Sequence, residues 1–183
     1  DKVSPKDIPF KLNRAQRRVL NKLEKLRKAG KPIKFILLKA RQWGGSTLVQ
    51  IYMLWIMLVH RRNWNTVICG DVETQSRNVR AMITKALNKY PSYLLGETVK
   101  FTPFEGSSKN KVIQNTNCVV SIGSFQKPDT LRSGDISGAH LTEIGLWRAT
   151  PGKKPEDLIQ SISGSIYDTA YTILGLESTA KGA

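Results

Sequence analysis

The sequence predicts an α/β fold in which a mainly parallel central sheet is flanked by helices. Two observations support this class. Short apolar runs alternate with longer segments of helical periodicity, and their order is strand, helix, strand, helix. With 183 residues the chain is long enough for one domain with a buried core. We therefore expect a single domain over residues 1–183, with a basic helical segment in 1–32 and the core in 33–183.

The first expected element is a helix over residues 14–29. Its apolar residues recur every three or four positions with basic residues between them, and Gly30 then provides a stop signal. The next run, IKFILLK at 33–39, is short and apolar, as in a strand that is covered on both faces. A second helix is expected over residues 46–60.

The same alternation continues with a strand at 65–70 and a helix at 74–90. At 98–124 the pattern changes, because three short strand-like pieces are separated by turn-rich segments. This change indicates a small antiparallel excursion that returns to the sheet. Two further strands are expected at 138–143 and 170–176. A short helix is expected between them, at 155–163.

The charge is strongly positive, with 29 Lys and Arg against 14 Asp and Glu, a formal +15. Residues 1–34 hold twelve of the basic and three of the acidic side chains. Such an excess favours an anionic partner, of which nucleic acid and an anionic membrane surface are the usual examples. The alternative is a basic face that is simply solvated. The longest apolar run, residues 51–59, is too short to span a bilayer and predicts a buried helix.

The cysteines and histidines do not predict a metal centre. Cys69 and Cys118 both lie in apolar, strand-like runs, so we expect two reduced thiols in the core. His60 and His140 are far from each other and from any cysteine pair. No zinc site can be built from this spacing.

The segment LLKARQWGGSTL, Leu37–Leu48, has the context of a phosphate-binding loop between a strand and a helix. Backbone N–H groups and the positive end of the helix dipole converge at such a junction. The usual pattern is Gly, four residues, then Gly-Lys-Ser/Thr. Here Gly44 is the second glycine, Gly45 stands in place of the lysine, and Lys39 in place of the first glycine.

The hydroxyl of that pattern is Ser46, which we expect to be a Mg²⁺ ligand, with Thr47 as the fallback. Lys39 and Arg41, on the strand side of the loop, could supply the missing positive charge. The alternative is a Gly-Gly helix start that is capped by Ser46.

An acidic residue ends the expected strand at 138–143. ATPases that activate water place a carboxylate at the end of a strand beside the phosphate loop, and Glu143 is the candidate. The usual residue before this glutamate is an aspartate that holds Mg²⁺, and Thr142 stands there instead. The alternative for Glu143 is an ordinary surface residue.

Together these segments resemble the ATPase domain of the large terminase subunit, the DNA-packaging motor of tailed bacteriophages. PFKLNRAQRRVL looks like the adenine-recognition segment of that family, with Gln16 as the base-reading side chain. KARQWGGST is similar to the family's variant loop, in which an early Lys or Arg replaces the missing lysine. Arg132, eleven residues before Glu143, matches the arginine finger, although Ser133 separates it from the glycine that usually follows. The ending LESTAKG looks like the motif that couples hydrolysis to movement.

The resemblance implies a P-loop NTPase of the RecA-like, ASCE type that uses ATP and Mg²⁺. By the same resemblance the catalytic residues would be Glu143, Arg132 and Arg41, and Ser46 would hold the metal. The coupling residues would be Glu177, Ser178 and Thr179. The residues implied in ATP binding are Gln16, Lys39, Arg41, Gln42, Trp43, Gly44, Gly45, Ser46 and Thr47.

The resemblance also implies a function, which is to hydrolyse ATP and move double-stranded DNA into a procapsid. The expected partners are DNA, a portal protein, a small terminase subunit and further copies in a ring, in the host cell cytoplasm and without a membrane. A nuclease domain would follow in a longer parent protein and is not expected within these residues. Two alternatives remain, a helicase-like ATPase stimulated by nucleic acid and a non-enzymatic nucleic-acid-binding module with a vestigial loop.

Overall fold

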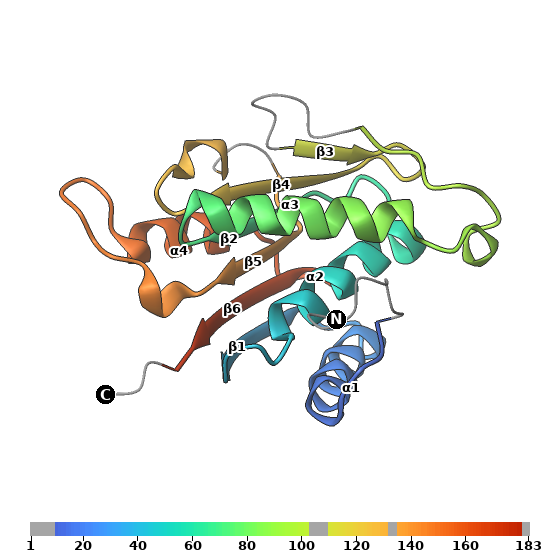
Figure 1. The fold of residues 1–183 in the computed structure, drawn as a ribbon, viewed down its shortest axis with the longest axis horizontal. Coiled ribbons are helices and arrows are strands. Elements are labelled where there is room, and N and C mark those ends of the chain that lie inside the picture. The colour runs from blue at the N-terminus through green and yellow to red at the C-terminus, as the bar shows by residue number, and fades with distance from the viewer. Residues whose placement is uncertain (1–9, 103–109, 132–134, 181–183) are drawn as a thin grey trace.

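The computed structural model describes residues 10–102, 110–131 and 135–180 (Figure 1). Six strands form one sheet in the order β1-β6-β5-β2-β4-β3. Every neighbouring pair is parallel except β3 and β4, which are antiparallel. This confirms the expected mainly parallel sheet with a small antiparallel part. The strands are β1 (Ile33–Lys39), β2 (Thr66–Gly70), β3 (Asn110–Ile113), β4 (Cys118–Ser124), β5 (Gly138–Thr142) and β6 (Ile173–Thr179).

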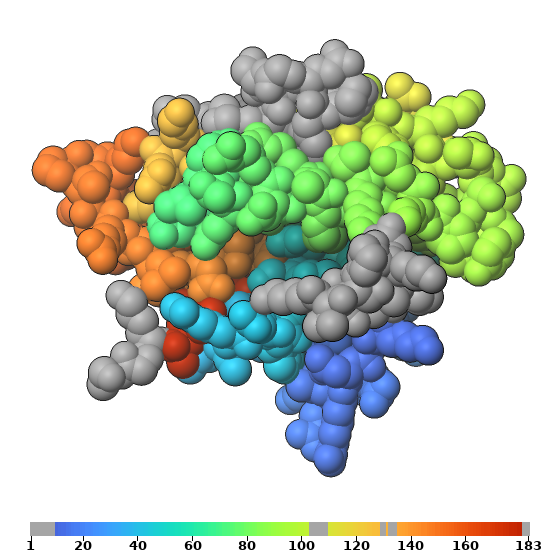
Figure 2. Space-filling view, viewed as in Figure 1, coloured from blue at the N-terminus to red at the C-terminus, as the bar shows by residue number. Residues whose placement is uncertain are grey.

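Four α-helices cover the two faces of this sheet: α1 (Arg14–Lys28), α2 (Gly45–Trp55), α3 (Glu73–Asn88) and α4 (Pro155–Gly164). Helices α1, α2 and α3 pack on one face and α4 on the other. Figure 2 shows the first of these faces, with α3 lying across it and α1 projecting from its lower edge. Among the described residues there are also three short 3₁₀ segments, at Ser92–Leu94, Pro128–Leu131 and Ile144–Leu146, and a π-helix at Ile56–His60.

Helix α1 begins where its sequence predicts, because Asn13 and Gln16 form a capping box. The Asn13 side chain accepts a hydrogen bond from the Gln16 backbone N–H, and the Gln16 side chain accepts one from the Asn13 N–H, both at 2.9 Å. Lys25, Arg27 and Lys28 lie in the last turn, where positive charge complements the helix dipole.

Two apolar clusters, one on each face, form the core. The larger cluster packs Met53, Ile56 and Ile83 against the sheet, and the smaller packs Leu158 and Ile162 of α4 against it. Burial of this kind is the main stabilising term in a domain of this size. Both cysteines are buried free thiols in these clusters, as expected. Burial, helped by the nearby charge of Asp71, raises the pKa of the Cys69 thiol to about 12, so it behaves as an inert core residue.

Most of the apolar run at 51–59 is buried, as its composition predicts, although Val59 is 45% exposed and the last turn is not α-helical. Helix α2 continues directly into a π-helix over Ile56–His60. Among the described residues, no helix is both long and apolar enough to cross a membrane.

The expectation that strand 33–39 is covered on both faces is wrong. Strand β1 lies at the edge of the sheet and pairs only with β6 among the described strands. One face, with Ile33 and Phe35, packs into the larger cluster. On the other face Ile36 and Leu38 are 79% and 71% exposed, because the apolar residues that α4 covers come from β2, β5 and β6. An apolar run of this kind does not reveal which strand lies at an edge.

The last strand also differs from the expectation. The sequence pattern predicts a strand at 170–176 with Glu177–Thr179 following it, whereas β6 runs from Ile173 to Thr179. The reason is pairing, since Leu37, Leu38 and Lys39 of β1 lie opposite these three residues. The polar triplet is therefore part of the sheet.

The one-sided burial of β1 generates a stability prediction for two matched substitutions in the same strand. Ile33→Ala should lower the free energy of unfolding by about 2–5 kcal/mol, because it opens a cavity in the core. Ile36→Ala should lower it by no more than about 1 kcal/mol, the range of strand propensity alone. Urea denaturation of both variants measures the difference, and equal losses would contradict the exposure of this face.

Candidate active site

The site lies where β1, β5 and β6 end and α2 begins. In open α/β sheets ligands bind outside the carboxyl ends of parallel strands. Side chains alternate between faces along a strand, so Glu177 and Thr179 of β6 both point to the face that carries α2. In the parallel register Thr142 of β5 lies opposite Glu177, and Lys39 of β1 opposite Thr179. Strand pairing thus gathers polar residues from three strands beneath the start of α2.

The loop between β1 and α2 makes a tight turn. Gly44 adopts a left-handed conformation with φ 77°, and α2 begins at the next residue with no side-chain cap. The N–H groups of the first turn of α2, together with its dipole, therefore remain available to an anion.

The absence of a lysine after Gly44 has a steric reason. A Cβ atom at Gly45 would overlap the indole ring of Trp43 and would lie 3.0 Å from Cδ of Lys39. The stem of Lys39 thus runs beside the backbone at the position where the usual lysine would begin.

Gln16 is bound to this loop. Its side chain is 3% exposed, and its Nε2 donates to the carbonyl oxygens of Trp43 at 3.3 Å and Gly44 at 3.1 Å. Because its Oε1 accepts from Asn13, both ends of the amide are engaged with backbone. Gln16 therefore connects α1 to the phosphate loop. Its role in reading a base stays a prediction.

Lys39 is the centre of the polar cluster. Its Nζ lies 3.1 Å from Oε1 of Glu143, 3.1 Å from Oε1 of Glu177 and 3.3 Å from Oγ1 of Thr179. Burial alone would lower the pKa of Lys39, but the charge of Glu177 and the hydrogen bond to Glu143 raise the pKa above its ordinary value. The side chain is therefore a firmly charged ammonium between two carboxylates.

Glu143 follows β5 directly and has a left-handed backbone, with φ 57°. This conformation costs a residue with a side chain on the order of 1 kcal/mol or more, and such strain is concentrated at functional sites. Its carboxylate accepts hydrogen bonds from the backbone N–H of Thr179 at 3.0 Å and from the Thr179 hydroxyl at 2.9 Å. Burial would raise its pKa, but Lys39 and Thr179 more than offset this and lower the pKa, so the group is ionised at neutral pH.

Glu177 is fully buried, with 0% exposure. Its Oε1 accepts from the Ser46 hydroxyl at 2.5 Å and the Thr142 hydroxyl at 3.3 Å, and its Oε2 lies 2.9 Å from Nε2 of His140. Burial acts to raise the pKa of Glu177, whereas His140, Ser46 and Lys39 together hold the pKa at about 2. The carboxylate is therefore an anion at any physiological pH.

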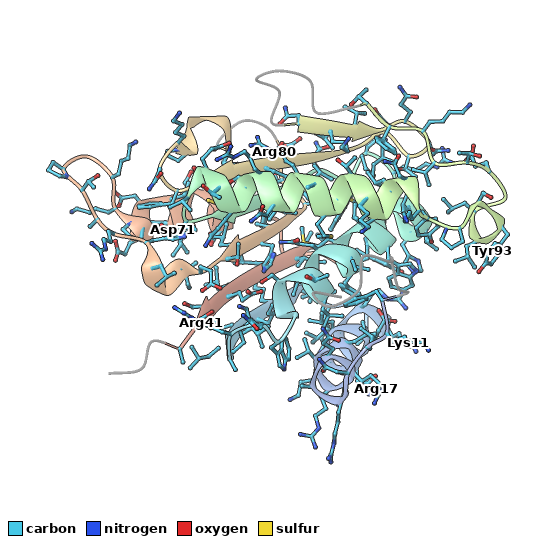
Figure 3. All side chains as sticks on the ribbon, in the orientation of Figure 1. Lys11, Arg17, Arg41, Asp71, Arg80 and Tyr93 are labelled. Carbon is cyan, nitrogen blue, oxygen red and sulfur yellow. The ribbon has the colours of Figure 1, made fainter. Side chains whose placement is uncertain are left out.

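Beside this cluster lies an open cavity of about 290 Å³. A larger cavity of about 560 Å³ adjoins it and shares Leu146 as a lining residue. Arg41 is exposed and lies on the loop that follows β1 (Figure 3), so its guanidinium is free to reach a ligand in the smaller cavity. That cavity is lined by Lys39, Arg41, Gln42, Gln75, Glu143, Leu146, Thr179 and Ala180.

Most of the residues singled out in the sequence therefore meet at one place. Ser178 lies at the margin, where its hydroxyl accepts from the Gly145 N–H at 3.1 Å. Arg132, the predicted arginine finger, lies outside the described residues. The residues brought together are Lys39, Arg41, Gln42, Trp43, Gly44, Gly45, Ser46, Thr47, Glu143, Glu177 and Thr179.

His140 also belongs to the cluster, although the sequence motifs did not single it out. It is fully buried in β5, and its Nδ1 has no hydrogen-bond partner among the described residues. A polar residue within the apolar run GAHLT, two positions before a strand end, was the signal that could have identified it. The described residues contain no group of three or more His, Cys, Asp or Glu side chains that could hold a metal by themselves. A metal ion at this place would therefore take some of its ligands from a bound phosphate.

No protein-family model matches the sequence, and no curated protein sequence matches it. Solved structures do match. The large terminase of bacteriophage HK97 gives a TM-score of 0.73 at 23% identity, over 95% of this chain and 34% of that one. The large terminase ATPase domain of Thermus phage P74-26 gives 0.58 at 15% identity, over 95% and 67%. A large terminase of a thermophilic bacteriophage, in complex with ADP, gives 0.63 at 15% identity, over 93% and 39%.

The likeness establishes the fold. The chain has the P-loop NTPase fold of large terminase ATPase domains, which confirms the expected fold class. It spans about a third of the length of the HK97 large terminase.

Proposed function

We propose that this chain is the ATPase motor domain of a viral large terminase, which hydrolyses ATP to drive double-stranded DNA into a procapsid. One observation carries the proposal. The ammonium of Lys39, the hydroxyl of Ser46 and the carboxylate of Glu143 converge where β1 and β5 end and α2 begins. Phosphoryl transfer needs these three functions, namely a cation for the phosphates, a hydroxyl for the metal and a group that orients water. One structural relative is a large terminase in complex with ADP.

In this proposal the phosphates of ATP lie over residues 44–47, where the N–H groups of the loop and of the first turn of α2 bind them. Lys39 then exchanges a carboxylate partner for phosphate oxygens. Its position supports this role, since its side chain is nearly buried yet lines the cavity beside the loop. Arg41 reaches the same cavity from its exposed side.

The residues present fit a Mg²⁺ ion that arrives with the nucleotide. Mg²⁺ prefers oxygen ligands and is bound by one or two protein groups together with substrate phosphates. The Ser46 hydroxyl, beside the anionic Glu177, is such a group. Bound there, the ion would neutralise charge on the phosphates.

Glu143 is the group that would orient the attacking water. Its carboxylate is ionised, faces the cavity and is fixed in direction by Thr179. Arg132 of a neighbouring copy would stabilise the charge that develops on the transferred phosphoryl group, an effect of about 10³–10⁵ in rate where such fingers act. An isolated domain would then hydrolyse ATP slowly.

The coupling role of residues 177–179 is supported by their contacts. Thr179 holds Glu143 through its N–H and its hydroxyl, so a change at the phosphates is transmitted to the end of β6. DNA would be gripped through its backbone, without sequence preference. In the host cell cytoplasm the parent protein would form a ring on the portal protein and cooperate with a small subunit.

The enzymatic part is tested with Glu143→Gln. The variant should bind ATP within about threefold of the unaltered chain, and its turnover should fall at least about 100-fold, because the amide cannot act on water as the carboxylate does. Nucleotide affinity and phosphate release measure the two effects. As a control, Glu97→Gln makes the same change at an exposed glutamate outside the site. If the unaltered chain never hydrolyses ATP at high concentration with DNA, the proposal fails and a non-enzymatic module is favoured.

The identity of the cation that replaces the missing lysine is tested by Lys39→Ala and Arg41→Ala. Lys39→Ala should weaken ATP binding about 10-fold to 100-fold, the value of a charge-assisted contact of about 1.5–3 kcal/mol. Arg41→Ala should lower turnover more than affinity, because the exposed guanidinium stabilises developing charge. Calorimetric binding and steady-state kinetics separate the effects, and thermal unfolding reports whether each variant folds. Unchanged affinity and turnover in both variants would exclude this compensation.

If the chain binds the DNA backbone through α1, its DNA affinity should fall with rising salt concentration, and the basic residues of α1 should account for part of that fall. The exposed basic residues of α1 include Arg17 (Figure 3) and Arg18, and neither contacts an acidic side chain among the described residues. Replacing both by Gln should reduce the slope of log affinity against log salt by up to about 2, or about 0.9 for each DNA phosphate that is no longer neutralised. The control pair Lys100→Gln and Lys127→Gln removes the same charge near the opposite edge of the sheet and should leave the slope nearly unchanged. A flat salt response of the unaltered chain would argue against backbone binding.

A further inference from the structure

The chain lacks one carboxylate that phosphate-loop ATPases use. In these enzymes Mg²⁺ is held by the loop Ser or Thr together with an aspartate at the end of a neighbouring strand. Here the loop hydroxyl is Ser46, but the residue that precedes the catalytic-site Glu143 is Thr142. A threonine hydroxyl is uncharged and contributes much less to holding a divalent cation.

Glu177 places a carboxylate at the same spot from one strand away. Strands β5 and β6 are parallel neighbours, and Thr142 lies directly opposite Glu177 in their register. The two side chains point to the same face, and the Thr142 hydroxyl donates to Oε1 of Glu177 at 3.3 Å. The same Oε1 accepts from the Ser46 hydroxyl at 2.5 Å. The carboxylate that touches the loop hydroxyl therefore comes from β6 and not from β5.

The orientation of this carboxylate is fixed. Its Oε2 lies 2.9 Å from Nε2 of His140, and both side chains are fully buried. This contact takes up Oε2, so that Oε1 is the oxygen directed to Ser46. His140 is thus a positioning residue for Glu177.

The charges around Ser46 also favour a cation. Two carboxylates, Glu143 and Glu177, share the single ammonium of Lys39. When Lys39 turns to the phosphates, Glu177 remains buried and loses the ammonium that lies 3.1 Å from its Oε1, which is unfavourable unless another cation approaches. A nucleotide brings further negative charge to the same place. A divalent cation that arrives with it would satisfy both groups.

We propose that Glu177 is the carboxylate that holds Mg²⁺ beside Ser46, in place of the missing aspartate at position 142. The inference rests on the proposed ATPase function and gives Glu177 a role distinct from coupling. A purely structural buried ion pair would make a different prediction, because its loss would change folding stability and nucleotide binding regardless of the metal.

The experiment measures binding of the fluorescent nucleotide mant-ATP in saturating Mg²⁺ and in excess EDTA. The unaltered chain should bind more tightly with Mg²⁺. Glu177→Gln keeps the size of the side chain and removes its charge. Its affinity in EDTA should be equal to or higher than that of the unaltered chain, whereas the gain produced by Mg²⁺ should shrink by about tenfold or more, the usual effect of removing such a metal-supporting group.

Two further variants test whether the effect comes from the carboxylate at this place in the site. Thr142→Asp in the Glu177→Gln background returns a carboxylate to the residue directly opposite in the register, and the gain from Mg²⁺ should recover. Glu97→Gln makes the same change at an exposed glutamate outside the site and should keep the gain within about twofold to threefold. Thermal unfolding of each variant reports whether it is folded.

The outcomes distinguish failure of the proposed function from failure of the metal assignment. If the unaltered chain binds no nucleotide, the proposed function fails. If the unaltered chain shows the gain from Mg²⁺ and Glu177→Gln shows the same gain, the function stands and this inference is overturned. An equal loss of affinity in Mg²⁺ and in EDTA would also overturn it, since it would indicate a structural role alone.

Discussion

The ammonium of Lys39 is the interaction on which the site depends. It joins the ends of three strands, because its partners Glu143, Glu177 and Thr179 follow β5 or belong to β6. Two carboxylates on one ammonium, with Glu177 fully buried and Glu143 partly buried, would without it repel each other and raise each other's pKa. With the ammonium between them both remain ionised, so this edge of the sheet holds two anions and one cation in direct contact.

The same arrangement explains why the loop differs from the usual pattern. The Lys39 side chain passes along the backbone of Gly45, and the Trp43 ring lies over that glycine, so a side chain at position 45 would not fit. Gln16 then holds the loop from the other side through its carbonyl oxygens. In this chain the positive charge beside the loop comes from Lys39 at the end of β1 and not from the start of α2. The alternative of a loop merely capped by Ser46 does not describe this geometry, since α2 begins after Gly44 with no side-chain cap hydrogen bond and the Ser46 hydroxyl donates to Glu177.

Glu143, which has a left-handed backbone, is connected directly to the end of β6 by hydrogen bonds. The residue is strained and is held by the N–H and the hydroxyl of Thr179 at the end of β6. Strain that is held by a few hydrogen bonds can be released when those bonds are exchanged. In the proposed motor, the group that orients water and the strand that transmits movement are thus a single hydrogen-bonded unit.

The sequence by itself determined the elements and their order, the phosphate-loop context and the acidic strand end, because apolar periodicity, caps and glycines act within a few residues. It did not determine that β1 lies at an edge with Ile36 exposed, nor that Glu177 lies within β6. Only the tertiary structure decided which strands are neighbours and in what register. That pairing, together with the packing of α2 on the sheet, brings His140, Glu177 and Ser46 together from three distant segments. The physical reason is that backbone hydrogen bonds between strands are indifferent to side chains, so adjacency is settled by packing of the whole sheet.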